Sequence, residues 1–351
     1  MPSDYRTEPA VSIIMPVRNE RDHIRAAVGS ALDQDIDVPF EVIVADGASD
    51  DGTRQILDEW ATREPRLRIV DNPAGATAHG LNCALAAVRA PYFVRVDGHS
   101  VARPDYVRRL LELLRDGRCE AAGGIVRAVG ASRFGRAVAA VHASRFAVGD
   151  AKQHYAQRAV YVDHVAHGGY ITELAREIGG FDESFVRNQD YEFDYRYHLA
   201  GGRILLEPSI VFDWRVRETP VALARQYFQY GYWKVRALQR HPSSLNLRWL
   251  VPPAFVATTL AGVIGIATTP GRVVLGASVG SYAALVALGG IVTSAPIGRR
   301  YAPLTALALA TIHVSWGSGF LVSAVEQAVN EAARPLGSWL PRLRAALRSR
   351  S

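Results

Sequence analysis

The chain has 351 residues, a formal net charge of +6 and two cysteines. This length exceeds that of one small domain and allows a full-sized catalytic core with an appendage. The basic residues are scattered instead of forming one arm, so we expect no nucleic-acid partner. Cys83 and Cys119 lie far apart without partners at metal-ligand spacing, which indicates a reducing, cytoplasmic setting. Residues 1–10 contain no apolar core of the signal-peptide kind, so we expect that the first domain is not exported.

The N-terminal part of the chain alternates strand-like and helix-like segments. Short runs rich in β-branched residues are followed by segments with helical spacing of apolar residues. This order predicts an α/β fold with a mostly parallel sheet and helices on both of its faces. The expected strands are Val11–Val17, Phe40–Asp46, Leu67–Asn72 and Tyr92–Asp97, and the expected helices are Asp22–Leu32, Thr53–Arg63 and Ala76–Arg89. Ligands of such sheets bind beyond the carboxyl ends of the strands, so the polar residues after each strand form the candidate site.

Those polar residues form three clusters, at residues 16–20, 46–51 and 97–99. Asp46 is able to accept hydrogen bonds from a base or a ribose, and its acidic turn suits a nucleotide whose diphosphate is neutralised by a divalent cation. Asp97 and His99 are candidate ligands for that cation, since Gly98 permits the backbone to turn between them. The same stretch also fits a simple Asp-Gly turn that caps the next helix, and the residues alone favour neither interpretation. No G-x-G-x-x-G follows the first strand and there is no Walker A lysine loop, which excludes those two nucleotide-binding motifs.

Four stretches carry a resemblance to glycosyltransferase family 2, in the order "VSIIMPVRNE", "FEVIVADGASDDGT", "VRVDGH" and "GGFDESFVRNQDYEFDYR". The resemblance covers roughly residues 10–235 and is to membrane-anchored bacterial enzymes of polysaccharide or cell-envelope synthesis, of the succinoglycan glucosyltransferase type. It implies a GT-A catalytic domain, which is a Rossmann-like sheet with helices on both faces. The donor implied is a nucleotide sugar, and UDP-linked sugars are the donors we expect.

The resemblance also assigns roles on the donor side. The Asp-x-Asp metal motif of the family falls on Asp97, Gly98 and His99, so Asp97 and His99 are the implied metal ligands. Histidine in the third position tolerates Mn²⁺ better than Mg²⁺, and both cations remain candidates. The residues implied in nucleotide-sugar binding are Pro16, Asn19, Glu20, Asp46, Asn82 and Asp97.

The family places its general base in the stretch "NQDYEFDYR", where Gln189 and Asp190 match the catalytic pair. Inverting transfer needs one carboxylate that takes a proton from the acceptor hydroxyl, and we assign this role to Asp190. The structural alternative is that Asp190, Glu192 and Asp194 form a solvated face at the start of a helix. That alternative explains Glu192 and Asp194 well.

Two further stretches are candidates for acceptor binding. Gly168 and Gly169 would let the backbone approach a sugar, or they would only bend a strand. Gln229 and Trp233 stand where processive synthases carry Gln-x-x-Arg-Trp, but Tyr232 replaces the arginine here. Trp233 is a candidate platform for an acceptor sugar, and the helix expected at about residues 219–240 fits equally well as an interfacial helix that lies on a membrane.

Three stretches that are almost free of charge follow this helix, at Trp249–Pro270, Val273–Gly298 and Tyr301–Val325. Each approaches the ~20 residues that a membrane-spanning helix needs. We therefore divide the chain into a catalytic domain at 1–240, a membrane region at 249–325 with two to three hydrophobic segments, and a basic amphipathic tail at 326–351. The number of crossings and the side of the tail stay open.

These features together predict an inverting, metal-dependent glycosyltransferase on the cytoplasmic face of a bacterial inner membrane. Its acceptor is expected to be a polyprenyl-linked saccharide in exopolysaccharide or cell-envelope synthesis. Transfer to polyprenyl phosphate itself and processive polymerisation are alternatives of the same class. A membrane carrier with a degenerate head is the alternative from another class.

Overall fold

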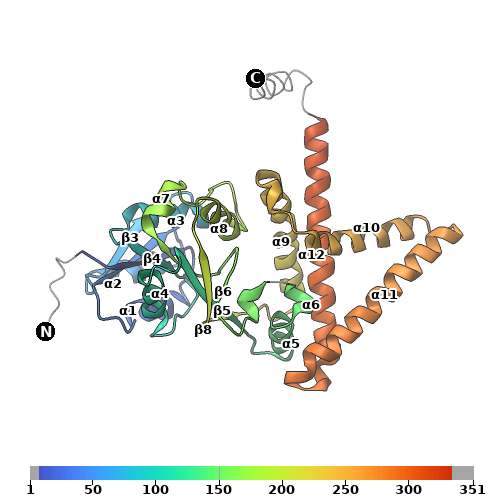
Figure 1. The fold of residues 1–351 in the computed structure, drawn as a ribbon, viewed down its shortest axis with the longest axis horizontal. Helices are drawn as coiled ribbons and strands as arrows, with labels where there is room; N and C mark the ends of the chain where they lie inside the picture. The colour runs from blue at the N-terminus through green and yellow to red at the C-terminus, as the bar shows by residue number, and fades with distance from the viewer. Residues whose placement is uncertain (1–7, 150, 334–351) are drawn as a thin grey trace. The chain divides into compact units, whose positions relative to one another are not determined.

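The computed structural model describes residues 8–149 and 151–333 (Figure 1). The chain forms two compact units. The first unit comprises Met1–Leu223 with Ala283–Thr311, and the second comprises Ala224–Tyr282 with Ile312–Ser351. The segments expected to lie in a membrane are therefore shared between the two units.

The first unit is built on one eight-stranded sheet, whose strand order is β3-β2-β1-β4-β7-β5-β8-β6. The neighbours β3, β2, β1 and β4 are parallel, as the sequence predicts. The short strand β7 is antiparallel to both β4 and β5, so β5 runs in the same direction as β4. The strands are β1 (Val11–Val17), β2 (Phe40–Asp46), β3 (Leu67–Asp71), β4 (Tyr92–Arg95), β5 (Ala121–Val129), β6 (Val160–Tyr161), β7 (Gly169–Ile171) and β8 (Ile204–Arg215).

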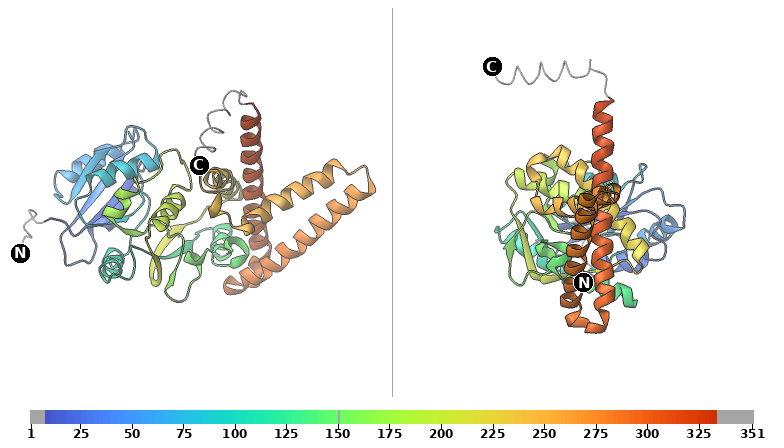
Figure 2. Two further views of the ribbon diagram at one scale, coloured as in Figure 1. Left: turned by 45° about the horizontal axis from the view of Figure 1, so that its top comes forward. Right: turned by 90° about the vertical axis from the view of Figure 1, so that its right-hand side faces the viewer.

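Helices cover both faces of this sheet (Figure 1, Figure 2). One hydrophobic core joins the sheet to α1, α2 and α4, and a second core on the opposite face joins it to α3, α7 and α8. The helices are α1 (Ile24–Leu32), α2 (Thr53–Ala61), α3 (Thr77–Ala87), α4 (Tyr106–Arg115), α5 (Arg133–His142), α6 (Arg145–Val148), α7 (Thr172–Glu177) and α8 (Gln189–Leu199), with a 3₁₀ turn η1 at Lys152–His154. The expected helices and strands all form, with ends that differ from the predicted ones by at most two residues.

Four long helices follow. They are α9 (Pro220–Arg240), α10 (Val251–Ile264), α11 (Thr269–Ser294) and α12 (Ala302–Ala332), with 3₁₀ turns η2 (Pro242–Ser244), η3 (Leu247–Leu250), η4 (Ala295–Ile297) and η5 (Arg299–Tyr301). Three helical segments are long and apolar enough to cross a membrane: Leu247–Ile264, Thr269–Ile297 and Arg299–Ala332. The tail expected at 326–351 begins inside α12, and its residues 334–351 lie outside the described residues.

Candidate active site

The carboxyl ends of β1, β2 and β4 meet at one edge of the sheet, because these strands are parallel neighbours. Asp46 is the last residue of β2, and its side chain is 2% exposed. Its Oδ2 accepts the Ser49 N–H at 3.4 Å and lies 3.7 Å from Nη1 of Arg54. Its Oδ1 is buried without a hydrogen-bond partner among residues 8–149 and 151–333. A buried acceptor without a donor costs roughly 1–3 kcal/mol, so Oδ1 favours a ligand that brings an N–H or O–H group.

The loop after β1 is fastened to the loop after β2. The side-chain oxygen of Asn19 accepts the Asp50 N–H at 3.0 Å, and the Asn19 N–H donates to Oγ of Ser49 at 2.9 Å. The Glu20 N–H donates to the hydroxyl of the first residue of α2 at 2.9 Å. Pro16 lies inside β1 and pairs with a residue of β2. The structure thus brings Pro16, Asn19 and Glu20 to the same edge as Asp46.

Asp97 follows β4 at this edge and forms an ion pair with the buried Arg95. Nε of Arg95 donates to Oδ1 of Asp97 at 3.0 Å, and Nε2 of His167 lies 3.8 Å from Oδ2. Burial alone would raise the pKa of Asp97, but Arg95, His167 and His99 outweigh it and hold that pKa well below its usual range. Asp97 is therefore a carboxylate at every physiological pH.

His99 lies beside Glu20, with its Nδ1 at 3.2 Å from Oε1. This contact raises the pKa of His99 above its usual value. The position between the two predicted ligands leaves no room for a side chain, because a Cβ on Gly98 would lie 2.4 Å from the side chain of Val17. Within the part of the chain that the structure describes, no group of three side chains is arranged to hold a metal ion by itself. Asp97 and His99 nevertheless fit a divalent cation that completes its coordination with water and substrate phosphates, as Mg²⁺ commonly does.

Asp190 lies in the first turn of α8, after Asn188 in the left-handed conformation (φ 61°). Its Oδ1 accepts the main-chain N–H of Tyr191 at 2.9 Å. Burial alone would raise the pKa of Asp190, but the charges of His164 and Arg95 lower it below its usual value. The Arg95 guanidinium thus pairs with Asp97, the predicted metal ligand, and its charge also helps to lower the pKa of Asp190, the predicted base. This shared cation links the donor motif to the base motif.

The other two carboxylates of α8 are not on a solvated face, which corrects the structural alternative drawn from the sequence. Glu192 is 1% exposed and pairs with Arg196 at 2.6 Å. Asp194 is fully buried, where its carboxylate binds Nδ1 of His164 at 2.7 Å, the Tyr170 hydroxyl at 2.9 Å and a main-chain N–H. They lie on either side of Phe193, which packs in the core, and each finds its partners in the protein.

Sequence reasoning assigned no role to Arg95, His164 or His167. Arg95 carries a signal, because a cation inside the apolar run "YFVRVD" needs a buried anion. His167 has φ 53° and stacks on Phe212 with ring centroids 4.0 Å apart, and burial lowers its pKa to about 4. For His164 the sequence offers no signal, since its contacts with α8 are long-range.

Gly168 and Gly169 lie at the start of β7. A Cβ on Gly168 would lie 2.8 Å from Val165, and one on Gly169 would meet Leu110 at 3.4 Å. Close packing therefore accounts for both glycines. Their role in acceptor binding stays a prediction.

Asn82 lies on α3, with its amide directed at the loop before α8 instead of the strand ends. It donates to the Phe181 carbonyl and to Glu183, and it accepts the Phe181 N–H, all at 2.8 Å. These contacts give Asn82 a role in positioning that loop. Its predicted contact with the donor stays untested.

Gln229 and Trp233 lie on the part of α9 that belongs to the second unit. Gln229 lines a cavity of about 430 Å³ together with Arg225, Phe228 and Tyr232. The Arg236 guanidinium lies 4.9 Å from the Trp233 ring. Nothing in these contacts distinguishes an acceptor platform from an interfacial helix, so both interpretations remain.

Three comparisons with known proteins bear on this site. The profile of Glycosyl transferase family 2 matches residues 12–177. The succinoglycan biosynthesis protein ExoA of Rhizobium meliloti (strain 1021) is 32% identical over 329 residues, which cover 91% of this chain and 96% of that protein. The mannosyltransferase PcManGT from Pyrobaculum calidifontis, solved in complex with GDP-Man and Mn²⁺, aligns over 92% of this chain and 88% of its own with a TM-score of 0.59 and 18% identity.

The structural likeness confirms the predicted GT-A fold, which the apolar C-terminal helices follow. The sequence likeness to ExoA extends through both units and not only through the catalytic motifs. The chain belongs to glycosyltransferase family 2.

Proposed function

We propose that the protein is an inverting, metal-dependent hexosyltransferase that moves a sugar from a UDP-linked donor to a polyprenyl-linked saccharide. The observation that carries this proposal is the shared cation at the sheet edge, where Arg95 pairs with Asp97 and also acts on Asp190. One buried cation thus pairs with the donor-side carboxylate and lowers the pKa of the base-side carboxylate. The name of ExoA supports a product in polysaccharide biosynthesis, and the ligands of PcManGT support a nucleotide sugar and a divalent cation.

The donor is held at the ends of β1, β2 and β4. Oδ1 of Asp46 accepts a hydrogen bond from the base or ribose, which supplies the donor group that this buried oxygen lacks among the described residues. Asp97 and His99 would hold the divalent cation, which neutralises the diphosphate and stabilises its departure. The loop of Asn19 and Glu20 lies beside this donor site. Its hydrogen bonds to the loop after β2 and to the first residue of α2 fix its position.

Asp190 takes the proton of the acceptor hydroxyl as that oxygen attacks the anomeric carbon. The bond from the anomeric carbon to the diphosphate oxygen breaks on the opposite face of the sugar, so the configuration inverts. The low pKa of Asp190 keeps it ionised and ready to accept the proton at neutral pH. Glu192 and Asp194 are engaged with Arg196 and His164, so neither of them offers a free carboxylate.

His164 is a positioning residue for this base. Asp194 fixes the ring through Nδ1 at 2.7 Å, while the charge of His164 lowers the pKa of Asp190 one helical turn before Asp194. Positions four residues apart share one face of a helix, so the same ring serves both carboxylates. Through its charge, His164 stabilises the ionised form of the base.

The three apolar helices bear on the choice of acceptor. Three apolar helices keep the enzyme at a membrane, and we place it in a bacterial inner membrane with the catalytic domain on the cytoplasmic side, where nucleotide sugars are made. The arginines between the second and third apolar segments agree with the positive-inside tendency. A lipid-linked acceptor lies within reach of an enzyme anchored in this way.

The test is a donor screen on the full chain in detergent, read by nucleotide release and by thin-layer separation of labelled lipids. Metal-dependent release from a UDP-sugar with a lipid-soluble oligosaccharide product supports the proposal. A product with one sugar on polyprenyl phosphate supports the first alternative, and a long water-soluble polymer supports processive synthesis. Absence of turnover with every donor and acceptor would refute the proposal.

A further inference from the structure

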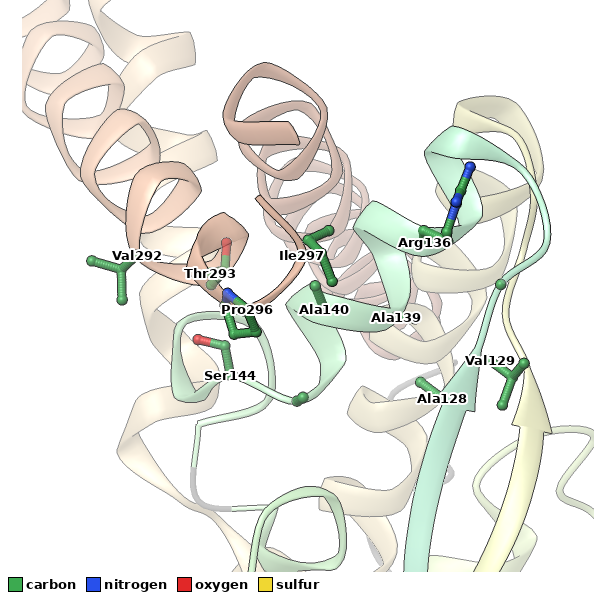
Figure 3. Close-up of a pocket in the computed structure, with 12 residues that line it drawn as sticks. Ala128, Val129, Arg136, Ala139, Ala140, Ser144, Val292, Thr293, Pro296 and Ile297 are labelled. Atoms are coloured by element: carbon green, nitrogen blue, oxygen red, sulfur yellow. The ribbon is translucent and has the colours of Figure 1, made fainter. Parts of the chain in front are cut away.

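A cavity of about 570 Å³ lies in the first unit, away from the predicted catalytic residues (Figure 3). Its walls are the end of β5, one side of α5 and the C-terminal end of α11 with η4. Of the residues that line it, only Arg136 is charged. The lining residues are Ala128, Val129, Gly130, Arg136, Ala139, Ala140, Ala143, Ser144, Val292, Thr293, Pro296 and Ile297.

Arg136, the charged residue of the lining, shares an aromatic neighbour with a second arginine, Arg300. The guanidinium of Arg136 lies 5.7 Å from the centroid of the Tyr301 ring, and that of Arg300 lies 5.6 Å from the same centroid. Two like charges beside one ring repel each other, and among the described residues no carboxylate forms an ion pair with either arginine. Glu218 instead accepts the main-chain N–H groups of Ala131 and Ser132, just before α5. An anion at the rim would relieve this repulsion.

The walls of the cavity place it at a membrane boundary. Residues 292–297 close the second apolar segment, Thr269–Ile297, and the arginines of η5 open the third, Arg299–Ala332. Arginines at such ends lie at the depth of lipid phosphates, and basic pockets beside spanning helices bind anionic head groups. The alanines of α5 and the side chains of Val292 and Ile297 offer a surface for an acyl chain.

The end of β5 that lines the cavity lies further along the sheet than Asp97 of the predicted metal site. Ala122 of β5 and Val94 of β4 both pair with Gly169, so they lie level with each other. Val129 is therefore about four residues further along its strand than Asp97, which is roughly 13 Å at 3.3 Å per residue.

We propose that this cavity binds an anionic phospholipid of the adjacent leaflet. The lipid phosphate lies near Arg136 and Arg300, and part of an acyl chain fills the space between Ala140 and Ile297. The lipid thereby joins α5 to the end of the membrane helix and stabilises the first unit. This role is separate from transfer, because none of the lining residues belongs to the predicted donor or base site.

The test uses the full chain in detergent with phosphatidylglycerol or phosphatidylcholine as probes. Native mass spectrometry counts the retained lipid, and thermal unfolding measures the stabilisation that it gives. We expect saturable binding of phosphatidylglycerol that Arg136→Gln weakens by about fivefold, the effect of one lost arginine near a lipid phosphate. Ala140→Phe should fill the cavity and abolish that binding. Arg133→Gln removes an exposed charge from the same helix without touching the cavity, so it should bind as the wild type does.

Two results would overturn the proposal. The first is equal retention of phosphatidylglycerol by all variants, or equal stabilisation by both lipids. The second is displacement of phosphatidylglycerol by undecaprenyl phosphate together with a raised KM for the lipid-linked acceptor in Ala140→Phe, which would make the cavity an acceptor site. Metal-dependent nucleotide binding by each variant confirms that it is folded, so a failure of the lipid site is distinct from a failure of the proposed enzyme activity.

Discussion

At the residue scale, Asp190 differs from Glu192 and Asp194, the other two carboxylates of α8. Glu192 binds Arg196 and Asp194 binds His164, whereas in the described contacts no basic side chain binds the Asp190 carboxylate directly. Asp190→Asn keeps the shape and hydrogen-bonding capacity of the side chain but removes the proton acceptor. We expect donor affinity near that of the wild type and single-turnover transfer lower by about 10²–10⁴-fold. Calorimetry with the donor and rapid-quench transfer measure the two quantities.

Glu192→Gln is the comparison for this prediction. Because Glu192 is buried against Arg196, its loss should lower the unfolding temperature and leave the turnover of folded protein largely intact. Because Glu192 is buried, we expect Glu192→Gln to reduce the stability of the protein and not its catalysis. If Asp190→Asn turns over normally, the base lies elsewhere.

The pH dependence of transfer tests the role of His164. The base acts as a carboxylate, so kcat should stay constant at neutral pH and fall only as the pH drops through the pKa of Asp190, below the usual value of about 3.9. His164 and Arg95 lower this pKa and Asp97 raises it. Removing the ring in His164→Gln should therefore raise the pKa of Asp190 and move the acid limb of kcat to higher pH. His198→Gln, near the other end of α8, is the control and should leave the pH profile of kcat unchanged. Identical profiles for the wild type, His164→Gln and His198→Gln would contradict the role of His164.

The ion pair between Arg95 and Asp97 determines which substitution of Asp97 can test the metal site. Asp97→Ala would leave Arg95 buried without its partner, so a dead variant would confuse misfolding with loss of the cation. Asp97→Asn is the cleaner change, since the amide oxygen still accepts a hydrogen bond from Arg95. We expect it to abolish cation-dependent donor binding while the unfolding temperature falls only slightly. His99→Asp should retain activity and prefer Mg²⁺ more strongly. Full activity of the wild type in excess chelator would refute the assignment of Asp97 and His99 as metal ligands.

At the scale of elements, the strands of the parallel half are predictable because each is a buried apolar run with a helix after it. β7 is not, since three residues carry too little pattern and its antiparallel pairings join segments far apart in sequence. The burial of Glu192 and Asp194 escapes prediction for the same reason. Their partners include His164 and Tyr170, and only the folded chain brings these to α8. The positions of Asp46, Asp97 and Asp190 at strand and helix ends could be predicted, because local sequence is informative there, while their roles in the site stay predictions.

Helix α12 offers a prediction of its own within the second unit. A Cβ on Gly319 would lie 2.0 Å from the main-chain oxygen of Phe228 in α9, so the two helices pack backbone to backbone. Gly319→Val should separate them and cost about 1–3 kcal/mol of stability. Gly276→Ala on α11 is the control, because a Cβ there meets nothing within 4 Å and should be neutral. Thermal unfolding in detergent separates the two, and equal unfolding temperatures would show that α9 and α12 do not depend on this contact.

At the scale of the whole molecule, the division into units does not follow the division into catalytic and membrane regions expected from the sequence. The first unit includes Ala283–Thr311, and α5 packs against η4, which belongs to the second apolar segment. The second unit begins at Ala224, inside the helix expected to end the catalytic domain. The C-terminal part of α11 and the N-terminal part of α12 therefore belong to the first unit, together with the sheet, and are not only an anchor attached to it.

A chain shortened to end at Gln239 tests this arrangement. It retains the predicted donor and base residues at Asp46, Asp97, His99 and Asp190, so metal-dependent nucleotide binding should persist within about threefold of the full chain, a difference under about 1 kcal/mol. It loses η4, so the exposed apolar side of α5 should lower the unfolding temperature, and it should lose transfer to a lipid-linked acceptor. Changing Ala140, which lines the cavity between α5 and η4, to Asp in the full chain disturbs this packing without removing the membrane helices. If the shortened chain transfers to the lipid-linked acceptor as well as the full chain does, the helices serve only as an anchor and the acceptor is recognised through its sugars alone.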